Sequence, residues 1–233
     1  RNRLAVVCLT GVFGNLIPAF MFATAIMKLD SSLTGILNSL TPICVVVLGA
    51  IFFRDKIHSQ KILGVLVGFA GLCLLTFTQH DISLHNLGYT SLVVIGTLSY
   101  GLNINLVSHY LKGIHPVQAA TVSLSLLALP TGLILWIQGF FTLNFQDPVM
   151  QWAVLNSVLL GVVGSALATA LFYMLVQKAG GLFASLVTYG IPFVALFWGY
   201  IDGERITWIE VLCLGIILTG VFLANRKVKE PGS

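Results

Sequence analysis

The sequence predicts an all-α polytopic membrane protein with eight transmembrane helices in an inverted-repeat arrangement. Three observations support this prediction: the composition, the length of the apolar runs and an internal repeat. The 233 residues are 57% hydrophobic and 9% charged, whereas a soluble domain has about 25% charged residues. Apolar runs of about 20 residues suit helices that cross a bilayer. The composition excludes an ordinary soluble enzyme, a disordered segment and a nucleic-acid-binding protein.

Eight helices are expected between the polar clusters of the chain. Each is long enough to cross about 30 Å of hydrocarbon at about 1.5 Å per residue. Strands are not favoured, because an isolated strand leaves backbone groups unpaired in lipid. The expected spans are 4–27, 31–53, 59–78, 87–111, 116–139, 151–177, 182–202 and 206–225.

The positive charges predict the orientation of these spans. Ten of the 12 Lys and Arg residues fall on the side of both termini, and Lys28 and Arg205 fall on the other side. Basic residues accumulate in cytoplasmic loops, so both termini are expected in the cytoplasm. The four tryptophans lie near the outer ends of their helices, as an aromatic belt would require.

The second part of the chain repeats the first. The matched positions are a Gly-Val-x-Gly motif, a single lysine, a proline in the middle of a span, and an acid–base–Ile turn. At a shift of 150 residues, or 149 for the turn, the pairs are Gly11 with Gly161, Gly14 with Gly164, Lys28 with Lys178, Pro42 with Pro192, and 55–57 with 204–206. The two copies cross the membrane in opposite directions, which is typical of secondary transporters.

The repeat defines the expected domains. Residues 1–79 hold the last three helices of a first repeat, 85–226 hold a five-helix second repeat, and 227–233 form a cytoplasmic tail. The first copy has no counterparts of the spans 87–111 and 116–139. We therefore expect two further helices before residue 1, giving a five-plus-five fold truncated at its N-terminus. A natural eight-helix protein is the alternative.

Short motifs occur in the same order in both copies. In the first they are Ala25-Ile26-Met27-Lys28, Ser31-Ser32, Leu37-Asn38-Ser39-Leu40-Thr41-Pro42, Asp55-Lys56-Ile57, Gly64 and Gly71. In the second they are Gly180-Gly181, Ala184-Ser185, Pro192, Glu204-Arg205-Ile206 and Gly220, with Cys213 in the place of Gly64. This pattern resembles the EamA-type domain of the drug/metabolite transporter superfamily. The resemblance implies a ten-helix inner-membrane carrier that exports or exchanges small metabolites, often amino acids, through a central cavity.

Two prolines in the middle of expected spans mark a candidate substrate-binding site. Pro42 and Pro192 lack an N–H group, so each frees the carbonyl four residues earlier. Those carbonyls belong to Asn38 and Thr188. A helix kink, a free carbonyl and a polar side chain at the same depth in the membrane can together bind a solute. A structural kink whose groups bond to neighbouring helices is the alternative.

Five further polar residues inside the spans complete the candidate substrate-binding set. Tyr100 and Asn103 lie three residues apart and share a helix face. Asn15 lies in the first span, and Tyr173 and Tyr189 lie in the sixth and seventh. Such groups suit hydrogen bonding to a neutral or zwitterionic solute. Hydrogen bonding between helices is the alternative role for each.

Ionisable residues are expected only near the ends of the spans. Glu210 is the nearest candidate for proton coupling, with an interfacial acid at a helix start as the alternative. The five histidines are scattered over loops and helix ends, and the four cysteines form no CxxC pattern. We therefore predict no metal site, no cofactor and no histidine relay.

The sequence favours a secondary transporter or exporter of small, amino-acid-like metabolites that works by alternating access, and not an enzyme. Without a coupling charge, a facilitator or exchanger is expected. A non-transporting scaffold subunit is one alternative. A membrane-embedded enzyme is another, but Ser99 and His109 lie about 15 Å apart along one helix. The expected partners are the lipid bilayer and a small metabolite, with no nucleic acid, and no oligomeric state follows from the sequence.

Overall fold

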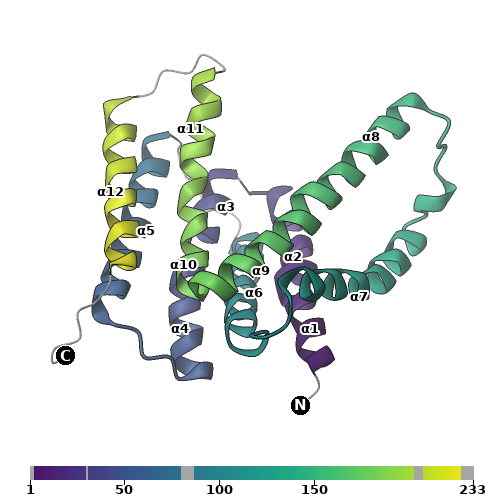
Figure 1. Ribbon diagram of the computed structural model, residues 1–233. Coiled ribbons are helices and arrows are strands. Elements are labelled where there is room, and N and C mark those ends of the chain that lie inside the picture. Colours follow the sequence, from purple (N-terminus) through teal and green to yellow (C-terminus); the bar gives the residue numbers. More distant parts are fainter. Residues whose placement is uncertain (1–2, 30, 80–86, 202–206, 227–233) are drawn as a thin grey trace.

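The computed structural model describes residues 3–29, 31–79, 87–201 and 207–226 of the chain. The expected tail at 227–233 and the turn at 204–206 lie outside these residues. The described part is helical and contains no strand (Figure 1). In chain order the elements are α1 (Arg3–Gly11), η1 (Val12–Leu16), α2 (Ile17–Ile26), α3 (Ser31–Asn38), α4 (Thr41–Phe53), α5 (Ser59–Gln79), α6 (Leu87–Tyr110), α7 (Pro116–Ile137), η2 (Phe140–Thr142), α8 (Pro148–Leu159), η3 (Leu160–Leu167), α9 (Ala168–Ala179), α10 (Gly181–Ser185), η4 (Leu186–Gly190), α11 (Ile191–Ile201) and α12 (Trp208–Asn225).

The predicted all-α membrane fold is confirmed. Each of the eight expected spans coincides with helical structure to within three residues at either end. Seven helical stretches in the described residues are long and apolar enough to cross a membrane, and Ser59–Leu75 of α5 is a shorter apolar helix. The seven are Arg3–Ile26, Leu33–Phe53, Gly88–Tyr110, Pro116–Ile137, Pro148–Ala179, Gly181–Trp198 and Trp208–Asn225.

The helix boundaries follow from local chemistry. Proline occupies the first turn of α7 and α8, where its missing N–H costs no helical bond. The Asp147 carboxylate caps α8 by accepting from the Val149 N–H. At the start of α12, Thr207 and Glu210 form a reciprocal capping box, which satisfies two backbone donors. Glu210 therefore has a structural role at this helix start.

Helices α5 and α12 pack with their backbones almost in contact, and they lie side by side in Figure 1. A Cβ atom added to Gly220 would lie 2.2 Å from the Gly68 backbone nitrogen. One added to Gly64 would lie 2.3 Å from the Ala224 nitrogen. Small residues allow this close approach between membrane helices. Because the two helices are counterparts in the predicted repeat, this packing joins the two copies.

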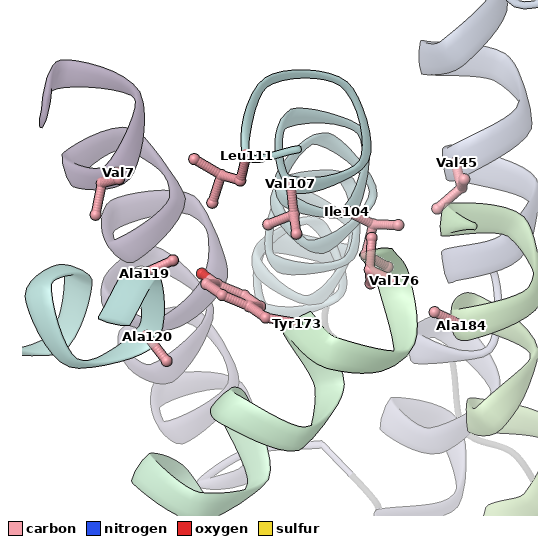
Figure 2. Close-up of a cluster of buried hydrophobic side chains, with 10 residues drawn as sticks. All are labelled: Val7, Val45, Ile104, Val107, Leu111, Ala119, Ala120, Tyr173, Val176 and Ala184. Carbon is pink, nitrogen blue, oxygen red and sulfur yellow. The ribbon is translucent and has the colours of Figure 1, made fainter. Parts of the chain in front are cut away.

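Helix α6 runs through the main packing cluster of the molecule. Figure 2 shows its Ile104 and Val107 side chains, and that of Leu111 directly after its end, facing buried residues of neighbouring helices. Those neighbours are Val7 of α1, Val45 of α4, Ala119 and Ala120 of α7, Tyr173 and Val176 of α9, and Ala184 of α10. The α6 helix therefore touches elements of both predicted copies.

The stretch α8–η3 is far less covered than its counterpart α1–η1. Helices α7 and α8 project together from one side of the molecule (Figure 1). A Cβ at Gly11 would lie 2.7 Å from the Ser123 carbonyl oxygen, whereas one at Gly161 would meet no atom within 4 Å. The second copy thus exposes a small-residue surface that the first copy buries. The two further helices expected before residue 1 stay a prediction.

Candidate functional site

Polar side chains along α6 bind helices of the first copy. The Thr97 hydroxyl lies 3.3 Å from the Leu37 carbonyl oxygen of α3. The Asn105 amide nitrogen donates to the Val45 carbonyl of α4 at 3.1 Å. Thr97 and Asn105 are both almost fully buried. In an apolar environment such bonds are needed to satisfy buried polar groups.

A second polar group lies where α1, η1, α6 and α9 meet. The Tyr173 hydroxyl lies 3.4 Å from the Thr10 carbonyl oxygen and 3.5 Å from Asn103 Oδ1. Figure 2 shows this hydroxyl directed toward α1. The Asn103 amide packs so closely on Gly14 that a Cβ there would lie 2.4 Å from its nitrogen. These contacts join the first copy, through Thr10 and Gly14, to Tyr173 of the second.

Asn15 extends this group. Its side-chain oxygen accepts from the Thr169 hydroxyl at 3.4 Å, so η1 of the first copy is again bonded to α9 of the second. Tyr100 lies one turn before Asn103 on α6, and its ring centroid lies 5.8 Å from that of Phe22. The structure therefore places Asn103 against Tyr173, and Asn15 against Thr169, which lies four residues before Tyr173 on α9. Tyr100 lies on the same helix face as Asn103.

The backbone around Asn15 has an unusual conformation that occurs twice. Val12–Leu16 forms a π-helix, and Leu160–Leu167 forms another. At the repeat shift of 150 residues, positions 12–16 fall on 162–166, inside the second π-helix. π-helical turns are rare and are frequently found at functional sites. The repeat pattern predicted paired glycines here but not the change of helix type.

The helices are also interrupted at both predicted proline sites. Helix α3 ends at Asn38, and Pro42 stands in the first turn of α4. In the second copy, the 3-10 segment η4 separates α10 from α11, which contains Pro192 near its start. The carbonyls expected to be free have partners. That of Asn38 accepts from the Thr41 hydroxyl, and that of Thr188 accepts from the Ile191 N–H.

Thr188 and Tyr189 bond within the protein. The Thr188 hydroxyl of η4 donates to the Ser185 carbonyl at the end of α10 at 2.8 Å. The Tyr189 hydroxyl donates to the Val65 carbonyl of α5 at 3.0 Å, and the side chain is fully buried. A Cβ at Gly68 would lie 2.5 Å from the Tyr189 ring. Tyr189 therefore links η4 to α5 in the manner of an interhelical hydrogen bond.

Two side-chain oxygens near the first break have no hydrogen-bond partner among the described residues. They are Thr34 Oγ1 and Asn38 Oδ1, both on α3 and both closed to solvent. The sequence identified Asn38 but not Thr34. Their i, i+4 spacing on one helix face was the available signal.

The sequence also missed the partner of His109. Its Nε2 atom lies 2.9 Å from Asp55 Oδ1, and its Nδ1 atom lies 2.9 Å from the Asn105 carbonyl oxygen. The Phe53 ring stacks on the imidazole with centroids 4.6 Å apart. Because the two residues are 54 positions apart, no local pattern reveals this pair. The His109–Asp55 pair ties the end of α6 to the loop that follows α4. No cluster of three or more metal-binding side chains was found in the part of the chain that the structure describes.

Comparison with known proteins shows what the chain is similar to. The sequence model of the EamA-like transporter family matches residues 1–77 and 88–226. An "Uncharacterized transporter" of Archaeoglobus fulgidus is 23% identical over 219 residues, which are 93% of this chain and 76% of that protein. "Protein PagO" of Salmonella typhimurium is 26% identical over 222 residues, 91% of this chain and 69% of that protein. A crystal structure with 15% sequence identity has the same fold, with a TM-score of 0.72 over 97% of this chain and 77% of that chain.

Proposed function

The chain belongs to the EamA-like transporter family and is a multi-pass membrane transporter; from this premise we propose that it moves small, amino-acid-like metabolites across the inner membrane by alternating access. One observation carries the proposal. The polar group of Asn15, Asn103 and Tyr173 joins the first copy to the second: Asn15 bonds to Thr169, and the Tyr173 hydroxyl reaches Thr10 and Asn103. In transporters built from inverted repeats, the solute site lies near the midplane at the interface between the repeats.

The chemistry of this group suits a neutral or zwitterionic solute. Its side chains are amides, hydroxyls and a phenol, which donate and accept hydrogen bonds without carrying a charge. The long distances of 3.4–3.5 Å from the Tyr173 hydroxyl indicate weak bonds. A solute could replace such bonds at a small cost in free energy. We therefore assign solute contact to Asn15, Tyr100, Asn103 and Tyr173 on this proposal.

The paired irregularities of the backbone support alternating access. Each copy has a π-helix at one matched position and a helix break before a proline at another. Such places absorb changes in backbone angles more easily than regular α-helix. Pro42 and Pro192, with Asn38 and Thr188 beside them, are then the bends about which the two copies rock. The clustering of Lys and Arg on one side supports cytoplasmic termini.

A metabolite export screen with cells that express the chain tests this proposal. The Tyr173→Phe variant removes the hydroxyl that reaches Asn103 and Thr10, and we expect it to lower export of the transported metabolite severalfold. Tyr200→Phe is the matched control, because Tyr200 is 65% exposed on the outside of the helices. A wild-type chain that changes the level of no metabolite would instead support a non-transporting scaffold.

The mode of energy coupling needs a separate assay. We propose a facilitator or exchanger, since the central helices carry no Asp or Glu at the polar group. Flux into proteoliposomes should then continue when the pH is equal on both sides. Flux that occurs only with a pH gradient would refute the facilitator.

A further inference from the structure

We propose that Thr34 and Asn38 form a binding subsite for an uncharged N–H donor of the solute, such as a carboxamide group. This inference rests on the proposed transport function and names a chemical feature of its cargo. The two residues lie four apart on α3, about one helical turn or 6 Å along its axis. Side chains at this spacing share one helix face.

Both oxygens are buried acceptors without partners. Thr34 is 6% exposed, and neither Thr34 Oγ1 nor Asn38 Oδ1 has a hydrogen bond among the described residues. Leaving such a group unpaired costs about 1–3 kcal/mol. Two other buried helical threonines avoid that cost by donating to a carbonyl of their own helix. Thr10 donates to Val7 at 2.8 Å, and Thr97 donates to Val93 at 2.9 Å.

The backbone beside these oxygens is already satisfied. The Gly35 carbonyl accepts from the N–H and the hydroxyl of Ser39. The Leu37 carbonyl accepts from the Leu40 N–H and lies within reach of Thr97. With the Asn38 carbonyl bonded to Thr41, the unpaired side-chain groups of this segment are the Thr34 hydroxyl and the Asn38 amide oxygen. The amide oxygen can only accept, and the hydroxyl can accept as well as donate, so a ligand group with N–H donors can bond to both.

The location fits a moving part of a transporter. Helix α3 contacts α2, α5 and α6, and it ends at the interruption before Pro42. The C-terminal end of a helix carries a partial negative charge, which also favours a donor. The subsite therefore lies directly before the helix break at Pro42, which the proposed mechanism uses as a bend.

The surrounding helices favour an uncharged donor over an ammonium group. None of α2, α3, α5 and α6 contains an Asp or Glu. A buried ammonium would have no carboxylate counterion there, and an unpaired buried charge is strongly destabilising. Metal cations such as Ca²⁺ take six or more oxygen ligands, and two are available. A carboxamide has two N–H donors and no charge, so one group can reach both oxygens.

Thermal unfolding of the purified full chain in detergent tests the subsite with matched solutes. The probes are nicotinamide with methyl nicotinate, and L-glutamine with L-glutamate γ-methyl ester. Each pair exchanges the carboxamide for an ester that lacks the N–H donors. We expect the carboxamide of at least one pair to raise the unfolding temperature more than its ester does. Equal responses within both pairs would overturn the proposal.

Three variants test whether the carboxamide response depends on Thr34 and Asn38. Thr34→Val and Asn38→Leu remove one oxygen each, and we expect each to weaken the carboxamide response about tenfold in concentration, which corresponds to about 1.4 kcal/mol. Thr131→Val is the matched control on α7 and should keep the response. Without solute, Thr34→Val should unfold at the same or a higher temperature than the wild type, because the hydroxyl it removes has no partner. A Thr34→Val protein that is clearly less stable, or that responds like the wild type, would contradict the proposal.

A flux assay separates this inference from the proposed function. If proteoliposomes carry solute but show no preference that depends on Thr34, the subsite is wrong and transport stands. If carboxamides bind in a Thr34-dependent manner but no flux occurs, the subsite stands and the transport function is wrong.

Discussion

The contact between α5 and α12 gives the sharpest structural prediction. Replacing Gly220 by alanine adds a Cβ that would lie 2.2 Å from the Gly68 nitrogen and 2.5 Å from its Cα atom. Ordinary contact begins at 3.4 Å, so the helices must separate by about 1.2 Å. Both atoms belong to backbone and cannot rotate away. Overpacking of this kind costs about 1–3 kcal/mol, and we expect that loss in the free energy of unfolding.

The matched control is Gly215→Ala on the same helix, because a Cβ at Gly215 meets no atom within 4 Å. Unfolding of the purified chain by SDS in mixed micelles, followed by tryptophan fluorescence, measures both variants. Gly220→Ala should unfold at a lower SDS fraction than the wild type, and Gly215→Ala should not. Equal midpoints for the two variants would refute the close backbone packing of α5 on α12.

Three further predictions concern the repeat, a helix cap and the His109 contact. Gly11→Ala should destabilise the chain by about 1–3 kcal/mol, because its Cβ would lie 2.7 Å from the Ser123 carbonyl oxygen. The counterpart Gly161→Ala meets no atom within 4 Å and should leave the midpoint of the same unfolding assay unchanged. Thr207→Ala removes the capping box of α12 and should cost about 0.5–2 kcal/mol; an unchanged unfolding midpoint would contradict the cap. A double-mutant cycle of Asp55→Asn and His109→Gln should give a coupling free energy of about 0–1 kcal/mol, since the two side chains are 37% and 28% exposed. A larger coupling free energy would contradict the expected screening of this pair by solvent.

The sequence was a good guide to the helices for a physical reason. Lipid penalises unpaired backbone and charge, so apolar length and polar interruptions define each span closely. The first span was expected at 4–27 and is helical over Arg3–Ile26. Asn103 and Tyr173 are polar residues inside apolar spans and need hydrogen-bond partners, and the structure pairs them with each other. Their role in solute binding stays a prediction.

The sequence was a poor guide wherever the outcome depended on a partner distant in the chain or on backbone detail. Proline chemistry indicated a free carbonyl at Asn38, but the nearby Thr41 hydroxyl bonds to it. The histidines looked scattered, yet His109 meets Asp55 across 54 residues. Apart from Asn15, both π-helices carry ordinary apolar and small residues, so no propensity marks them. Which polar groups pair depends on how the helices pack in three dimensions, and the order of residues in the sequence does not give that packing.

The hydrogen bonds of α6 do not follow the boundary between the two predicted copies. By sequence α6 begins the second copy, but Thr97, Asn105 and His109 bond to α3, to α4 and to the loop that follows α4 in the first copy. Toward α9 of the second copy, the bond from Tyr173 to Asn103 is long, at 3.5 Å, and a second bond at 3.2 Å runs from Gln177 to the Leu111 carbonyl just after the end of α6. If the copies rock against each other, the weaker contact should break first. Helix α6 would then travel with α3 and α4, and the surface that slides lies between Asn103 and Tyr173, where the proposed solute contacts are.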